Sequence, residues 1–180
     1  AGVGVVAPDS DNLVLDPDTI VEVDDGTSLT LRGTYMFSPN WGFDVLASWP
    51  FNHDIKLGGV KIAETDHLPP TFSMQYHFLP DGTIQPYVGA GLNYTTFFSE
   101  EVTQAAIDNE ITGISLDDSF GLALQIGADW TFGNRWLLNF DLRWIDIESD
   151  LEATIAGAAV DAGTVKIDPW VYSINIGYTF

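Results

Sequence analysis

Few residues in this chain have side chains that carry acid–base or metal chemistry. There is no cysteine, and the histidines are His53, His67 and His77. His53 stands next to Asp54 and His67 next to Asp66, so the two pairs could bring nitrogen and carboxylate ligands to one metal ion. Two histidines and two aspartates at the base of a loop are more often a polar rim, and no Ser–His–acid combination is recognisable. We therefore expect no enzymatic activity, no metal and no cofactor.

Five charged residues stand inside otherwise apolar stretches of the sequence. A buried charge without a partner is costly, so we expect these residues to pair with one another. They could simply neutralise each other's charge, or they could form a polar plug that closes the interior of the protein. The five are Arg32, Asp44, Asp129, Asp141 and Arg143.

The remaining acidic residues are gathered in a few places. The chain has 26 acidic residues and 6 basic ones, which gives a formal net charge of −20. A charge of this sign argues against nucleic acid as a partner. A soluble protein usually spreads its charge over its whole surface. Here all the acids but Asp44, Asp81, Asp129 and Asp141 lie in four stretches, which are 9–25, 53–66, 99–118 and 146–168.

The segments between these acidic stretches alternate between large apolar and small polar residues. A period of two residues is the signature of a β-strand. Residues 1–8 give an eighth strand that is short for a membrane strand of about 9–11 residues, so we expect the N-terminal strand to be truncated. The other seven segments are 28–37, 41–49, 72–78, 87–94, 120–132, 136–144 and 170–180.

One face of each predicted strand is bulky and aromatic, and the other is small and polar. The interior of an eight-stranded barrel is only wide enough for side chains. Gly, Ser, Thr and Asn fit such an interior, whereas rows of Phe and Trp do not, so the bulky face should meet lipid. The alternative is a lipocalin-like soluble barrel, which would need more charge on its polar face. No stretch approaches about 18 consecutive apolar residues, which excludes a spanning helix.

The connections between the predicted strands alternate in length. The turns at 38–40, 80–82 and 133–135 are tight, and the other four connections are long and acidic. This pattern is typical of outer-membrane barrels, with short periplasmic turns and long extracellular loops. We expect an all-β, antiparallel, up-and-down eight-stranded transmembrane barrel that forms a single domain over residues 1–180, in the outer membrane of a Gram-negative bacterium. The aromatic C-terminal residue, Phe180, agrees with this expectation.

The expected hairpins also place the inward-facing residues. Pairing across the first tight turn puts Arg32 opposite Leu46 and diagonal to Asp44, within reach of a long side chain. The same reasoning puts Arg143 opposite Gln125. These positions predict a plug in the periplasmic half of the barrel.

Apolar residues continue to alternate within the acidic connections. We therefore expect the strands to extend beyond the bilayer with an apolar inner lining, although packing between loops without any ligand would give the same pattern. The extension would form a hydrophobic chamber for a small molecule. The inward-facing residues expected along this path are Leu46, Phe97, Ile145 and Val171.

Prolines mark a place where the wall of the barrel could open. Pro50 ends the third predicted strand, and Pro69 and Pro70 begin the fourth, which is its neighbour. Proline donates no hydrogen bond to a strand ladder. This seam could therefore act as a lateral gate, or the prolines could simply end two strands at a loop. Pro8 and Pro169 mark a second, weaker candidate.

Several stretches resemble the OmpW family of outer-membrane proteins, in order and at similar spacing over most of the chain. They are TYMFSPNWGFDVLASWPFNH, HLPPTFSMQYHF, QPYVGAGLNYTTFF, LDDSFGLALQIGADW and DPWVYSINIGYTF. The chain departs from the family pattern at Arg143, which stands where the family has an aromatic residue in the lumen.

The resemblance implies a channel-like barrel that admits small hydrophobic molecules and releases them sideways into the membrane. The alternative is a structural or receptor barrel whose acidic loops are the binding surface and which transports nothing. In either case, we expect a monomer whose partners are outer-membrane lipids and lipopolysaccharide, and no nucleic acid. A small hydrophobic solute is a further partner in the transport case.

Overall fold

The computed structural model describes residues 1–9, 13–16, 19–133 and 135–180. Asn134, in the third predicted tight turn, lies outside the described residues. Within the described residues, strands account for nearly all of the regular structure, and the helix α1 (Gln104–Ile107) is a single short turn. None of the described helical residues forms a helix that is long and apolar enough to cross a membrane.

Eight strands form a closed antiparallel barrel. Around the wall the order is β11, β12, β15, β1, β4, β5, β8 and β9, and pairing of β9 with β11 closes the ring. The sequence-based prediction of the fold is confirmed, including the short N-terminal strand. The barrel strands are β1 (Gly2–Ala7), β4 (Gly26–Met36), β5 (Trp41–Ser48), β8 (Thr71–His77), β9 (Ile84–Val102), β11 (Ser119–Phe132), β12 (Trp136–Ile145) and β15 (Trp170–Tyr178).

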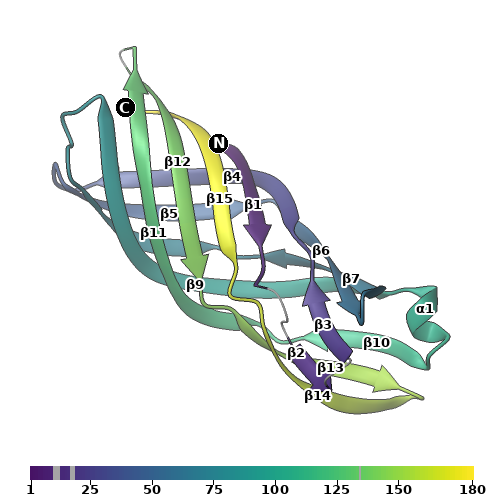
Figure 1. The fold of residues 1–180 in the computed structure, drawn as a ribbon. Coiled ribbons are helices and arrows are strands. Elements are labelled where there is room, and N and C mark those ends of the chain that lie inside the picture. The colour runs from purple at the N-terminus through teal and green to yellow at the C-terminus, as the bar shows by residue number, and fades with distance from the viewer. Residues whose placement is uncertain (10–12, 17–18, 134) are drawn as a thin grey trace.

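The long acidic connections continue the wall as further strands. The hairpin of β6 and β7 pairs on one side with β3 and on the other with the far end of β9, while β10, β13 and β14 form a separate sheet. Figure 1 shows these strands gathered beyond one end of the barrel, away from the C-terminus. They are β2 (Leu13–Asp16), β3 (Thr19–Val23), β6 (Phe51–Leu57), β7 (Val60–Leu68), β10 (Ile111–Leu116), β13 (Glu148–Ile155) and β14 (Ala158–Lys166).

The two faces of the barrel wall have the predicted character. Large apolar side chains point outward, and Trp49, Phe120 and Tyr35 are 63%, 69% and 72% exposed. A continuous outer face of this kind is stable in contact with lipid rather than with water. The inner face carries small and polar residues that are nearly all buried, among them Ser73, Asn93, Gln125, Asn139 and Asn175.

The strand register matches the expected one. Arg32 pairs with Leu46 across β4 and β5, and Gln125 pairs with Arg143 across β11 and β12. Because a slip of one residue would turn every side chain to the other face of the wall, this agreement fixes which charged residues point into the lumen.

Candidate functional site: an apolar chamber above a charged plug

The interior of the barrel is divided into a polar part and an apolar part. Polar and charged side chains fill the lumen between the membrane-spanning strands. Apolar side chains fill the interior towards the strands that extend beyond the barrel, where they form one continuous cluster.

Asp44 lies at the centre of the polar part and has no exposed surface. Its Oδ1 atom accepts a hydrogen bond from Arg32 Nε at 2.6 Å and another from Thr34 Oγ1 at 2.8 Å. Its Oδ2 atom accepts a hydrogen bond from Arg143 Nη2 at 3.1 Å. One carboxylate therefore binds two guanidinium groups, one from the neighbouring strand β4 and one from β12 across the lumen.

Tyr87 connects the rest of the network. Its hydroxyl accepts hydrogen bonds from Arg32 Nη1 at 2.8 Å and Asn139 Nδ2 at 2.9 Å, and it donates one to Asp141 Oδ2 at 2.6 Å. Asn139 also donates to Asp129 Oδ1 at 2.7 Å. All five charged residues singled out in the sequence thus belong to one network.

Tyr87 and Asn139 were not expected in this network from the sequence. Both stand on the small polar face of their strands, and this position in the sequence could have indicated that their side chains point into the lumen. The buried His77 lies against Tyr87 with ring centroids 5.0 Å apart and a contact of 3.2 Å to Gln75 Oε1. The network fills the lumen with charges that an apolar molecule would have to desolvate in order to pass.

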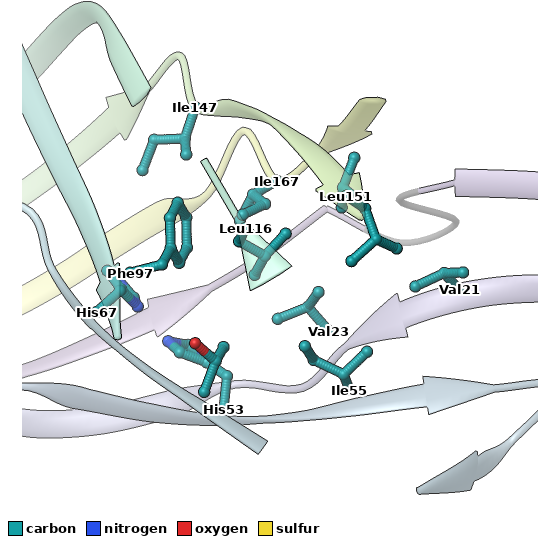
Figure 2. A pocket seen from close by; sticks show the side chains of 12 residues that line it. Val21, Val23, His53, Ile55, His67, Phe97, Leu116, Ile147, Leu151 and Ile167 are labelled. Atoms are coloured by element: carbon teal, nitrogen blue, oxygen red, sulfur yellow. The ribbon is translucent and has the colours of Figure 1, made fainter. Parts of the chain in front are cut away.

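The apolar part contains a chamber (Figure 2), which we call the outer chamber. Counting all the space between the lining atoms, its volume is about 460 Å³, but little of that space is wide enough for a water molecule. Binding of a small molecule therefore requires side chains to move. Nine of the lining residues are apolar and three are polar: Val21, Val23, His53, Ile55, Thr65, His67, Phe97, Leu116, Ile147, Leu151, Val165 and Ile167.

The four residues expected along the hydrophobic path all point inward. Leu46, Phe97, Ile145 and Val171 are between 1% and 9% exposed. Phe97 lines the outer chamber, whereas the other three do not. Leu46 pairs with Arg32 and Val171 pairs with Arg143, so the chamber lies farther from the plug than the sequence indicated.

The two histidines of the β6–β7 hairpin lie together in the outer chamber. The ring centroids of His53 and His67 are 4.7 Å apart, and Phe51 and Phe97 flank His67 at 5.5 and 5.8 Å. This hairpin lies beyond the membrane-spanning part of the barrel. Burial lowers the pKa of both histidines, and burial together with the neighbouring His53 lowers the pKa of His67 to about 3.

The aspartates next to these histidines point elsewhere. Asp54 forms an ion pair with Lys61 at 2.7 Å, and Asp66 accepts a hydrogen bond from Asn52 at 3.1 Å. Because side chains alternate along a strand, each aspartate faces away from the histidine beside it. The four residues therefore do not converge on a common point.

Acid is expected to loosen the β6–β7 hairpin through His67. The pKa of this residue is about 3 in the folded protein and 6.5 when unfolded, so between these values the unfolded hairpin binds a proton that the folded one does not. The contribution of neutral, buried His67 to the stability of the folded hairpin is complete above pH 6.5 and is lost as the pH falls towards 3. Amide hydrogen exchange, corrected for the intrinsic rate, should therefore be faster in this hairpin at about pH 4 than at about pH 7.

A His67→Phe variant provides the control, because it keeps an aromatic ring but cannot be protonated. Carboxylates that titrate in the same pH range are unchanged in this variant. If the variant shows the same acid-dependent exchange as the native protein, His67 is not the cause.

The three prolines of the expected lateral gate lie at a break in the wall. The pairing of β5 with β8 ends at Leu46 and Thr71, and the pairing of β6 with β7 begins at Phe51 and His67. Within the described residues, no ladder pair joins the two strands in between. Pro50 is exposed, Pro69 is buried and Pro70 is half-buried.

Backbone hydrogen bonds are present on the other side of the Pro69–Pro70 segment and at the second candidate opening, near Pro8 and Pro169. On the far side of Pro70, its carbonyl accepts a hydrogen bond from Tyr94 N at 3.1 Å, so β9 retains that segment. Near Pro8 and Pro169, Asp9 N donates to Ile167 O at 2.9 Å and bridges the strand ends. Of the two candidate positions, the one with the interrupted ladder lies between residues 47–50, at the junction of β5 and β6, and residues 68–70, at the junction of β7 and β8. We call this position the proline seam.

Comparison with known proteins finds outer-membrane proteins that match this chain over its whole length. The model of the OmpW family matches residues 1–180. Outer membrane protein W of Vibrio cholerae is 42% identical over 188 aligned residues, which cover 100% of this chain and 86% of the relative. A more distant relative is the dibenzothiophene metabolism operon protein PahQ of Pseudomonas aeruginosa, which is 24% identical. The alignment covers 91% of this chain and 76% of PahQ.

The fold is shared with solved structures as well. The crystal structure of the outer membrane protein OprG from Pseudomonas aeruginosa superposes with a TM-score of 0.87 at 35% identity, covering 99% of this chain and 92% of that one. Together with the lipid-facing aromatic wall, these matches place the protein in the bacterial outer membrane. The chain belongs to the OmpW family of outer-membrane β-barrel proteins.

Proposed function

We propose that this barrel takes up small hydrophobic molecules through the outer chamber and releases them sideways into the membrane. One observation carries the proposal: beyond a lumen that is filled by a hydrogen-bonded network of charges, the interior opens into an apolar chamber. A hydrophobic molecule gains by leaving water for such a chamber. It would lose that gain on entering the plug, where it must desolvate charges.

The proline seam supplies an exit that avoids the plug. Leu46 lies beside the seam and Phe97 lines the chamber next to His67, so the apolar interior reaches the place where the ladder is interrupted. Lipid lies on the outside of the wall, next to the exposed Trp49. An apolar solute can therefore pass from chamber to lipid without crossing water. The name of the relative PahQ, which refers to dibenzothiophene metabolism, agrees with a hydrophobic aromatic solute.

A second candidate function rests on the acidic surface. Asp117, Asp118, Asp146, Glu148 and Asp150 line an open hollow beside the barrel wall. In this alternative the protein is a structural or receptor barrel whose acidic surface binds a partner, and nothing passes through the chamber.

Filling the chamber distinguishes the two functions. Leu151 lines the chamber and is 6% exposed, whereas Val160, on the neighbouring strand β14, is 42% exposed. We expect Leu151→Trp to reduce the uptake of radiolabelled p-xylene by intact cells to the rate of cells without the protein. The matched Val160→Trp variant should retain the native rate.

Folding of both variants is checked by the anomalous migration of the unboiled protein on a gel. If cells with and without the native protein take up p-xylene equally fast, the transport proposal is wrong and the receptor function is favoured.

A further inference from the structure

Three polar side chains interrupt the apolar lining of the outer chamber, and all are buried. His53, Thr65 and His67 are 2%, 2% and 4% exposed. Figure 2 shows the two histidines on the same side of the chamber, with Phe97 beside them and the labelled aliphatic residues around the remainder. Buried polar groups normally have hydrogen-bond partners, so the partners of these three need to be identified.

The hydrogen bonding of His53 defines which of its nitrogens carries a proton. His53 Nδ1 contacts the backbone carbonyl oxygen of Asp24. A carbonyl oxygen only accepts hydrogen bonds, so Nδ1 must be the protonated nitrogen. Burial lowers the pKa of this imidazole and keeps it neutral, although Asp24, Asp25 and Asp66 oppose the effect. Nε2 is therefore a bare acceptor, and it is buried without a partner.

The other two polar groups are also available to a ligand. Within the described residues, the ring of His67 has aromatic neighbours but no hydrogen-bond partner. As a neutral imidazole it offers one donor and one acceptor. Thr65 Oγ1 has carbonyl contacts at 3.4 Å, beyond the usual hydrogen-bond distance.

These groups restrict the kind of molecule that the chamber holds best. The His53 acceptor has no partner within the described part of the protein, and a hydrocarbon leaves this buried group unpaired, so its cost in free energy persists. An ionised molecule would have to shed its hydration in a chamber whose polar groups are all neutral. A neutral molecule with an apolar body and a hydroxyl or N–H group avoids both costs.

We propose that the outer chamber selects small apolar molecules that carry one hydroxyl or N–H group, which donates a hydrogen bond to the histidine pair His53 and His67. A hydroxyl fits the pair particularly well, because it can donate to one imidazole and accept from the other. The inference rests on the proposed function, since it names the class of solute that the same chamber takes.

Three probes of similar size test the donor requirement. p-Cresol carries a hydroxyl where p-xylene carries a methyl group, and 4-methylanisole offers an acceptor but no donor. We expect p-cresol to bind the native protein in lipid nanodiscs about five- to tenfold more tightly than p-xylene, the ratio that one hydrogen bond gives. 4-Methylanisole should bind more weakly than p-cresol.

The ring nitrogens of the histidines provide a direct readout. In protein labelled with ¹⁵N-histidine, p-cresol should shift the ring resonances of His53 and His67, and p-xylene should not. His77 lies in the plug beside Tyr87 and serves as an internal reference whose resonance stays in place. A His53→Phe/His67→Phe variant keeps both aromatic rings, so it should still bind p-xylene but lose the preference for p-cresol. His77→Phe should keep the preference.

The outcomes separate this inference from the proposed function. If p-cresol and p-xylene bind equally well and the resonances of His53 and His67 do not move, the donor requirement is wrong while the apolar chamber stands. If none of the three probes binds, the chamber is not a solute site, and both the inference and the proposed function are overturned.

Discussion

Replacing Asp44 with alanine is expected to lower the free energy of unfolding by about 3–5 kcal/mol, the range found when one partner of a buried ion pair is removed. Asp44 binds Arg32 and Arg143 at once, and the side chains of all three are less than 10% exposed. Without this carboxylate, two guanidinium groups remain in the lumen. Arg143 keeps Asp141 at 3.4 Å, and Arg32 keeps the hydroxyl of Tyr87.

Urea unfolding of the barrel in lipid vesicles measures this change. The matched control is Glu148→Ala, which breaks the ion pair with Lys166 on the exposed outer strands β13 and β14. Exposed ion pairs contribute little to stability, so this variant should be indistinguishable from the native protein. An Asp44→Ala barrel that unfolds at the same urea concentration as the native one would show that the charges are solvated and that the lumen is not sealed.

Replacing Pro69 and Pro70 with alanine is expected to reduce uptake of a hydrophobic solute to the rate of cells without the protein. The change restores two backbone N–H donors in the segment between the paired residues Leu46–Thr71 and Phe51–His67. Because the carbonyl of Pro70 already faces β9, the N–H of residue 69 is the donor that can serve the seam. A continued ladder would close the proline seam while leaving the outer chamber and the plug intact. Entry would remain possible, but the molecule would have no exit to lipid.

Pro86→Ala is the matched control for this prediction. Pro86 is also a barrel proline, but it lies in β9 opposite Ala128, far from the seam. Uptake of radiolabelled p-xylene should therefore be at the native rate in the Pro86 variant and at the rate of cells without the protein in the Pro69/Pro70 variant. Native uptake by a correctly folded Pro69/Pro70 variant would contradict lateral release at this seam.

Much of the barrel could be predicted because lipid imposes a simple rule on it. Every membrane strand must alternate between an apolar outer face and a polar inner face. Segments such as Phe120–Phe132 follow this rule without interruption, so their faces and register could be derived from the sequence. The pairings of Arg32 with Leu46 and of Gln125 with Arg143 followed from tight turns alone.

The plug was predicted only in part. Charged residues in an apolar stretch are conspicuous, and their need for partners is general. The connecting residues Tyr87 and Asn139 carry no charge and stand 52 positions apart in the chain. Strands β9 and β12 flank β11, and Tyr87 reaches Asn139 only because Gly127 on β11, which lies between them, has no side chain. The alternating pattern of the sequence does not reveal such a contact between strands that are not direct neighbours.

The outer chamber was the least predictable part. Most of its lining residues lie within the acidic stretches, where the alternation is interrupted by register shifts such as those between Ile55 and Lys56 and between Leu151 and Glu152. A shift of this kind turns the following side chains to the other face. The apolar character of the lining and its position above Leu46 were evident from the sequence, but the fact that Ile145 and Val171 lie outside it was not.

Photolabelling with a short alkyl diazirine would test most directly whether hydrophobic molecules enter the outer chamber and leave it sideways. The probe also dissolves in lipid and labels the outer wall in any case, so only inward-facing residues are informative. Labels are expected on Leu116, Leu151 and Ile167 in the chamber and near Pro69 at the seam, and none on Asn139 or Asn175 within the plug. Labels on Asn139 and Asn175, with the chamber residues unmodified, would contradict the account and indicate a path straight through the barrel.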